Sequence, residues 1–183
     1  MHPNLTEVMA RLDDSRAAVR ASLERIYEVD RSRQPADGRW SVDEVLEHLS
    51  LVNRRFDRVV GAAISRAMQA GLGSEQAPRV PLADAVGRST ADRTDRRSSP
   101  EDSVPTGTIH GSVAVEAWER AHEGLRATLA AADGLALGEV VAEHRRWGPL
   151  TVYQWAEVCA GHEARHAEQI DEIAAQIAGR HGA

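Results

Sequence analysis

Apolar residues recur at intervals of three and four along four long stretches of this chain of 183 residues, and polar or Pro- and Gly-containing stretches separate them. This spacing places the apolar side chains on one face of an α-helix, and each such face needs a partner that buries it. We therefore expect helices over residues of about 4–29, 41–70, 112–132 and from 151 to near the C-terminal end. Because no convincing pair of strands accompanies them, the pattern predicts an all-α four-helix bundle.

Two of these helices begin with recognisable capping residues. Ser41 is followed three residues later by Glu44, and Thr151 is followed three residues later by Gln154. In this pattern the two side chains hydrogen-bond backbone N–H groups that the first helical turn leaves without partners. We therefore expect Ser41 to cap the second helix and Thr151 to cap the fourth.

A long connection separates the second and third helices. Residues 72–110 are rich in Pro, Ser, Asp, Arg and Gly, and the prolines at 78, 81, 100 and 105 exclude a long regular element. We expect a crossover loop that can travel the height of the bundle, so the helices that it joins need not be hairpin neighbours. With 183 residues, the whole of 1–183 is expected to form a single domain.

Charge and cysteine content narrow the expected partners and compartment. The formal net charge is −6, and all 22 basic residues are Arg, without a dense basic stripe. Such a chain is poorly suited to nucleic acid or an anionic membrane, because both require clustered positive charge. Cys159 is the only cysteine, which excludes an intrachain disulfide. No signal-peptide pattern or bilayer-spanning segment is evident, so we expect a cytoplasmic protein.

Three histidines lie on apolar helical faces. His48 is three residues after Val45 and four before Val52, so we expect its ring to point into the bundle. His162 and His166 lie one turn apart on the apolar face of the fourth helix. If those faces meet, three imidazoles come together, and imidazole is the commonest protein ligand for Zn, Ni, Fe and Cu. The arrangement predicts a divalent metal site; the alternative is that each histidine is an ordinary core or surface residue.

The stretch from His162 to His166 also matches H-E-x-x-H, the zinc-peptidase signature in which Glu163 would activate water. The extended signature requires Gly and His where this chain has Gln169 and Glu172. In the other common form a Glu on a further helix is the third ligand, and too few residues follow for such a helix. We therefore disfavour a peptidase and keep Glu163 as a weak catalytic candidate, expected to be solvated or to hydrogen-bond a ligand.

Several motifs together resemble those of the DinB superfamily, in the broad group related to YfiT-like metal-dependent hydrolases. The chain reads G-R-W-S-V-D-E-V-L-E-H-L at 38–49, G-P-L-T-V-Y-Q-W at 148–155 and H-E-A-R-H-A-E-Q-I at 162–170, with a Pro-rich middle. The resemblance covers nearly the whole chain. It implies a four-helix bundle, commonly dimeric, so we expect a homodimer. It also implies a divalent ion, typically Ni or Zn, on three histidines, which by motif are His48, His162 and His166.

The resemblance is less specific about the reaction. Some relatives are transferases or isomerases that use a low-molecular-weight thiol such as mycothiol, bacillithiol or glutathione, and we favour this activity with a small-molecule substrate. Three protein ligands leave open positions where a metal ion lowers the pKa of a bound group. The same site would support a hydrolase with a metal-bound hydroxide, and a non-enzymatic binding or stress-response module is a third alternative. Three imidazoles accept several metals, so sequence does not select the ion.

These alternatives call for different additional side chains. A thiol cosubstrate needs cationic or polar groups, for which Arg54, Arg55 and Arg165 are candidates. A hydrolase needs a general base, and Glu163 and Glu47 are the nearest carboxylates in sequence, although we expect both to be exposed.

The remaining polar and aromatic candidates have more ordinary expected roles. Cys159 lies one turn before His162 and is a candidate thiolate ligand or nucleophile, with a small buried core residue as the expected role. Trp155 is expected to pack in the core and is a candidate for the pocket wall, and Gln169 is a candidate to orient a ligand. Five other histidines are expected in termini, loops or exposed helical positions, as non-ligands: His2, His110, His122, His144 and His181.

Overall fold

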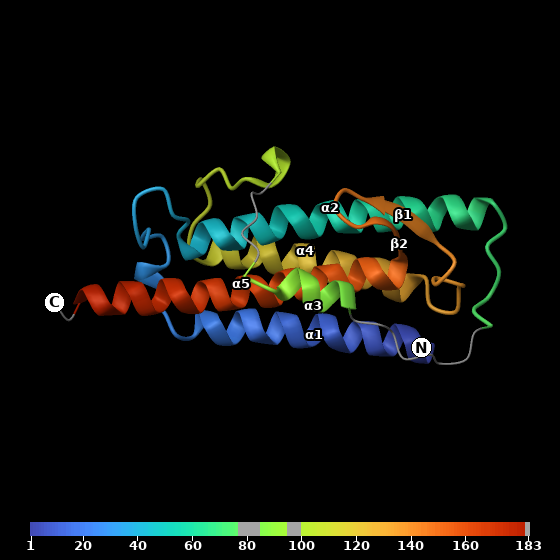
Figure 1. The fold of residues 1–183 in the computed structure, drawn as a ribbon, viewed down its shortest axis with the longest axis horizontal. Helices are drawn as coiled ribbons and strands as arrows, with labels where there is room; N and C mark the ends of the chain where they lie inside the picture. Colours follow the sequence, from blue (N-terminus) through green and yellow to red (C-terminus); the bar gives the residue numbers. More distant parts are fainter. Residues whose placement is uncertain (77–84, 95–99, 182–183) are drawn as a thin grey trace.

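Four long helices run along the length of the molecule, as the apolar spacing predicts (Figure 1). The computed structural model describes residues 1–76, 85–94 and 100–181. The long helices are α1 (Pro3–Leu23), α2 (Val42–Gln69), α4 (Ser112–Ala131) and α5 (Val152–His181). The most extensive packing joins α1 to α5 and α2 to α4, which confirms the four-helix bundle. Within the described ranges, no helix has both the length and the apolar character needed to cross a membrane.

Both expected capping pairs are present. The Ser41 hydroxyl accepts from the Glu44 backbone N–H at 3.2 Å, and the Glu44 carboxylate accepts from the Ser41 backbone N–H at 2.7 Å. Thr151 and Gln154 make the same reciprocal pair, at 3.3 and 2.9 Å. These contacts fix the first turns of the two helices that carry the candidate metal ligands.

The first helix is shorter than the apolar pattern predicts. It ends at Leu23 rather than near residue 29, and a 3₁₀ turn follows at Glu28–Asp30. Arg31 donates from its guanidinium to the Leu23 carbonyl at 3.1 Å, which satisfies an acceptor at the end of the helix. Ile26 is buried but Tyr27 is 81% exposed, so Tyr27 does not extend the core face. The prediction of a helix to about residue 29 was therefore wrong.

A two-stranded hairpin precedes α5 where no strand pair is expected from the sequence. Strands β1 (Val141–His144) and β2 (Gly148–Thr151) pair antiparallel, with His144 opposite Gly148. Residues 145–147 form the turn, and Gly148 has a φ of +69°, a conformation that favours glycine. The Trp155 indole donates to the Ala142 carbonyl at 3.2 Å and so fastens the hairpin to α5.

The connection after α2 also contains regular structure that the sequence does not predict. A short helix, α3 (Ala85–Ala91), packs on α5, and a second 3₁₀ turn covers Glu101–Ser103. The backbones of α3 and α5 approach so closely that a Cβ at Gly161 would overlap the Gly87 carbonyl. The prolines at 78 and 81 lie outside the described residues.

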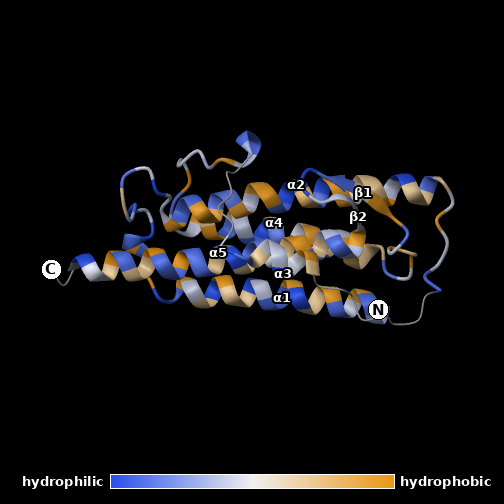
Figure 2. Ribbon diagram, in the orientation of Figure 1, coloured by the Kyte–Doolittle hydropathy of each residue, from blue (hydrophilic) through white to orange (hydrophobic). Residues whose placement is uncertain are grey.

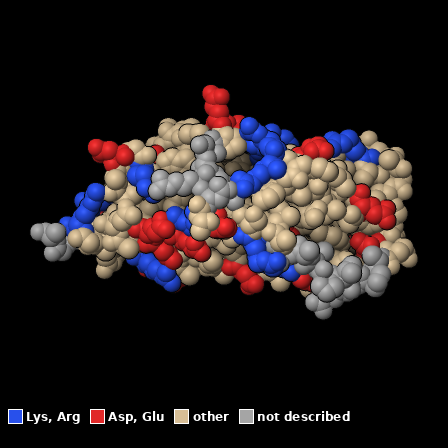
Figure 3. All heavy atoms as spheres, viewed as in Figure 1, with Lys and Arg blue, Asp and Glu red and all other residues tan. Residues whose placement is uncertain are grey.

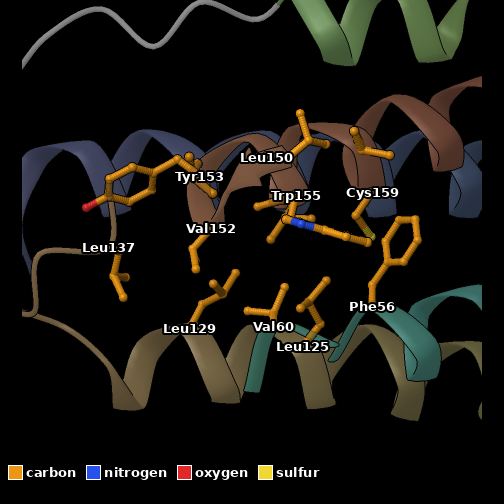
Figure 4. Close-up of a cluster of buried hydrophobic side chains, with 14 of the residues drawn as sticks. Phe56, Val60, Leu125, Leu129, Leu137, Leu150, Val152, Tyr153, Trp155 and Cys159 are labelled. Atoms are coloured by element: carbon orange, nitrogen blue, oxygen red, sulfur yellow. The ribbon is translucent and has the colours of Figure 1, made fainter. Parts of the chain in front are cut away.

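The core is divided along the bundle into two hydrophobic clusters. Apolar and polar residues alternate along each helix in Figure 2, and Figure 4 shows the cluster nearest the hairpin, where Phe56 and Trp155 meet edge to face at 5.1 Å. Between the clusters, four buried polar side chains, one from each long helix, are linked by hydrogen bonds through a shared carboxylate, and we call them the polar layer. Its members are Ser15, Asn53, His122 and Glu163.

Candidate metal centre

The three histidines singled out by their helical positions lie together. His48 comes from α2, and His162 and His166 come from successive turns of α5. The Nε2 atom of His162 is 3.2 Å from the Nε2 atoms of both His48 and His166. Their potential ligand atoms all lie within 4.8 Å of one another. The bundle therefore brings three imidazoles from two helices to one point, which we call the histidine triad.

Hydrogen bonds at the outer ring nitrogens orient two members of the triad. His48 Nδ1 lies 2.6 Å from the Ser103 carbonyl oxygen, and His166 Nδ1 lies 2.8 Å from Gln169 Oε1. Both partners are acceptors, so each Nδ1 carries the proton and each neutral ring presents a bare Nε2 lone pair to the centre. This is the arrangement that protein ligands of metal ions adopt. Gln169 therefore has the orienting contact that its position in the sequence indicated.

The spacing of the nitrogens fits a divalent ion. Two ligands about 2.05 Å from a zinc ion at a tetrahedral angle lie about 3.3 Å apart. The observed Nε2 separations of 3.2 Å are close to that value. Without an ion, His162 Nε2 carries at most one proton and so can donate fully to only one of the two bare Nε2 atoms of His48 and His166. The donor set and its spacing therefore suit a divalent transition metal, and three protein ligands leave further coordination positions open.

Burial favours the neutral form of two triad members. The exposed fractions of His48 and His166 are 3% and 7%. Burial lowers the pKa of His48. Burial also lowers the pKa of His166 well below the usual value, and the neighbouring His48 lowers it further. Trp40 packs on His48 with ring centroids 5.0 Å apart. Neutral imidazole is the form that ligates metal ions, so this environment favours coordination.

The triad opens into a pocket of about 640 Å³ formed by α2, α5 and the β1–β2 hairpin. Trp155, a candidate for this role from its sequence position, lines it, and so do Phe56 and Trp147. Figure 3 shows a hollow on the surface with blue arginine side chains beside it. A small molecule can thus reach the triad from solvent between aromatic walls.

Glu163 points away from the histidine triad, although His162 is next to it in the sequence. Its side chain is buried, so the prediction that it is exposed was wrong. It is fully buried in the polar layer, where its carboxylate accepts hydrogen bonds from four side chains on three other helices. Burial raises its pKa, but the contacts from His122, Ser15 and Trp118 outweigh burial and leave the pKa lowered. The donors are Ser15 at 2.7 Å, Asn53 at 2.8 Å, Trp118 at 2.9 Å and His122 at 2.9 Å.

The prediction for His122 was also wrong, because this residue is neither exposed nor in a loop. It is 1% exposed within α4, and its Nδ1 donates to Glu163. Its position four residues after Trp118 and three before Leu125 is a signal in the sequence that its ring faces the core. His122 remains outside the triad, as expected.

Glu47 and Cys159 are both held by other contacts. Glu47 is 6% exposed rather than solvated, and it accepts from the Thr106 hydroxyl at 2.6 Å and the Gly107 backbone N–H at 2.9 Å. Cys159 is fully buried, as expected for a core residue, with its sulfur 3.3 Å from Asn53 Oδ1. Burial raises the pKa of its thiol well above the usual value.

The other histidines lie outside the triad or beyond description. His2 accepts from the Asn4 backbone N–H at the start of α1, and His110 lies 3.6 Å from Asp43 at the surface. His144 lines the pocket from the end of β1. This position could not be predicted, because the hairpin itself was not. The side chain of His181 lies outside the described part of the chain.

The three candidate arginines separate in space. Arg55 and Arg165 line the pocket, whereas Arg54 is exposed and is absent from the lining. Arg165 also donates to the Asp92 carbonyl of the crossover segment. The sequence did not distinguish Arg54 from Arg55 as a pocket residue. Successive residues of a helix point in different directions, so only one of the two reaches the pocket.

Comparisons with known proteins agree with this fold. The crystal structure of TT2238, described as a four-helix bundle protein, superposes with a TM-score of 0.59 and 20% identity, covering 92% of this chain and 98% of that one. The uncharacterized protein YuaE of Bacillus subtilis strain 168 is 24% identical over 170 residues, which are 92% of this chain and 98% of YuaE. The family model described as DinB superfamily matches residues 11–170. The chain therefore belongs to the DinB superfamily.

Proposed function

We propose that this protein is a metal-dependent transferase that uses a low-molecular-weight thiol. The observation that carries the proposal is the histidine triad, whose Nε2 atoms converge at 3.2 Å in a pocket open to small molecules. His48, His162 and His166 would hold a divalent ion such as Zn or Ni. When bound, that ion supplies Lewis acidity, which lowers the pKa of a thiol or water at an open coordination position.

The residues around the triad favour a thiol over water as the nucleophile. Among the described residues that line the pocket, none is Asp or Glu. Glu163 and Glu47, the two carboxylates closest in sequence to the triad, are instead buried in contacts elsewhere. A thiol has an ordinary pKa near 8.5 whereas that of water is about 15.7, so a metal ion has to lower the pKa of a thiol much less before it loses its proton without a neighbouring carboxylate base.

The chain's own side chains supply orientation and shelter for such a reaction. Ser103 and Gln169 keep the Nδ1 protons of His48 and His166 in place, and aromatic side chains form part of the pocket wall beside the centre. Buried Cys159 takes no part, because its sulfur contacts Asn53 and not the pocket.

Thiol consumption tests the proposal. The protein loaded with Zn or Ni is mixed with monochlorobimane and with glutathione, bacillithiol or mycothiol in turn. In the expected reaction the sulfur forms a bond to the chloromethyl carbon, the C–Cl bond breaks, and chloride and the thiol proton enter the buffer. Product fluorescence should exceed the uncatalysed rate with at least one thiol.

The His166→Ala variant and the chelator-treated protein should both return to the uncatalysed rate, while a His110→Ala variant should match the parent because His110 lies outside the triad. The proposal is overturned if all three thiols react at the uncatalysed rate with protein that demonstrably holds the metal. A metal-loaded protein of that kind would be a binding module or a hydrolase.

A further inference from the structure

The pocket has a charge opposite to that of the chain as a whole. The formal net charge of the protein is −6, yet five arginines and no carboxylate occur among the described residues that line the pocket. The arginines are Arg39, Arg55, Arg145, Arg146 and Arg165. Positive charge gathered in a concave, partly apolar site raises the local concentration of anions.

Two elements bring arginines to this pocket. Arg145 and Arg146 are in the turn of the hairpin, and Arg55 is on α2. The ring of His144 lies among them: its pKa is lowered by burial and then by the positive charges of Arg55 and Arg146. Those two guanidinium groups therefore act on the same ring from different elements.

The hairpin that carries these arginines is held firmly against the pocket wall. Trp155 donates from its indole to the Ala142 carbonyl, and the His144 ring meets Trp155 with centroids 4.9 Å apart. The turn thus has a defined position above Trp155 and Phe56, and Arg146 stacks on Trp147 at 4.8 Å. Phe56 and Trp155 are buried, whereas Arg145 and Arg146 are exposed.

The ion pair that Arg55 makes within the protein is a weak one. Arg55 pairs with Asp102 at 3.3 Å, and the Asp102 side chain is 62% exposed, so solvent weakens the interaction. Guanidinium groups in proximity repel one another, and a carboxylate or phosphate between them removes that repulsion with bidentate hydrogen bonds.

We propose that the pocket accepts an organic anion, with a carboxylate or phosphate group bound by Arg55, Arg145 and Arg146 and an apolar part lying against Trp155. This inference rests on the proposed function, in which the histidine triad holds the reactive group at the other end of the ligand. It names the acceptor class that a thiol transferase of this kind would use.

Calorimetric titration with three probes tests the inference: 4-phenylbutyrate, phenyl phosphate and the neutral 4-phenylbutanamide. Both chelator-treated and Zn-loaded protein are titrated, because a carboxylate can also bind a metal directly. At least one anion should bind about tenfold more tightly than the amide in both forms of the protein. Equal binding of the amide and both anions, or anion binding only to the Zn-loaded form, would overturn the inference.

Matched variants assign the binding to the named residues. Arg55→Gln and the double variant Arg145→Gln/Arg146→Gln should each weaken anion binding about tenfold. Arg54→Gln removes the same charge from the neighbouring position, outside the pocket, and should change it less than about twofold. A loss with Arg54→Gln as large as that with Arg55→Gln would show a general charge effect and contradict the inference.

The two proposals fail separately. Anion selectivity without thiol consumption would remove the transferase proposal alone, because the titrations involve no reaction. Thiol consumption without anion selectivity would remove the inference alone.

Discussion

Removal of the Glu163 carboxylate should destabilise the bundle severely, because this group links all four long helices. Ser15 reaches it from α1, Asn53 from α2, and Trp118 and His122 from α4, all within 2.7–2.9 Å. In Glu163→Ala these buried donors lose their acceptor. Breaking a buried charged contact by deleting one partner costs about 3–5 kcal/mol, and a whole domain has a stability of about 5–15 kcal/mol.

The amide substitution is predicted to be much milder. In Glu163→Gln the amide oxygen can replace Oε1, which accepts from Asn53, Trp118 and His122. The amide N–H group then replaces Oε2 and can donate to the Ser15 hydroxyl, which already lies 2.9 Å from the Leu12 carbonyl and can donate there. One weakened contact to His122 and the lost charge remain, for an expected cost of about 1–2 kcal/mol.

Urea unfolding followed by circular dichroism measures these differences, with chelator present so that metal binding does not contribute. Glu168→Ala, at an exposed position of the same helix, is the control and should stay within about 0.5 kcal/mol of the parent. The reasoning is refuted if Glu163→Ala costs less than about 1 kcal/mol, or if Glu163→Gln costs as much as Glu163→Ala. In the first case Glu163 would not be the link between the helices.

Three further predictions follow from local contacts. Gly161→Ala should lower the free energy of unfolding in urea by about 1–3 kcal/mol, because the new Cβ would overlap the Gly87 carbonyl. Gly179→Ala, with open space around it, should be neutral or stabilising. Equal effects of the two substitutions would contradict this packing. Cys159, fully buried with a raised thiol pKa, should resist iodoacetamide in the native protein and react only after denaturation, and native labelling at a free-thiol rate would disprove its burial. Gln169→Leu should weaken zinc binding about 10–100-fold in competition with a chromophoric chelator, and unchanged affinity would show that the contact to His166 does not orient the ligand.

The histidine triad was predictable from sequence because its members continue regular helical spacings of apolar residues. His48 occupies a place between Val45 and Val52 on a face that is buried as predicted, and His162 and His166 are one turn apart. Once the two helices pack, such positions must converge. The capping pairs were predictable for a similar reason, since their chemistry involves only residues three apart.

Glu163 was misjudged because α5 is buried on more than one side. The prediction assumed a single buried face, as for an ordinary amphipathic helix, and Glu163 lies about 100° around the helix from His162. In the structure α5 packs against α1, α2 and α3, so the faces of α5 that carry His162 and Glu163 both point into the protein. His122 shows the opposite case: its spacing from Trp118 and Leu125 already indicated burial, and the prediction overlooked it.

The hairpin escaped prediction because each strand has four residues and little apolar alternation. Val141 is 51% exposed, so β1 has no continuous apolar face for a sequence pattern to detect. Its position is decided by tertiary contacts, notably the indole of Trp155 on the Ala142 carbonyl. The pocket arginines at 145 and 146 therefore could not be placed before the structure was known.

The metal content of the purified protein is the measurement that tests the central claim most directly. Elemental mass spectrometry is applied to the parent, His48→Ala, His166→Ala and the surface control His110→Ala, each after incubation with Zn or Ni and removal of excess ion. The histidine triad predicts about one ion per chain in the parent and in His110→Ala, and a loss of that ion in the other two variants. A parent without bound ion, or an ion that persists in both His48→Ala and His166→Ala, would contradict the claim that the triad is a metal centre.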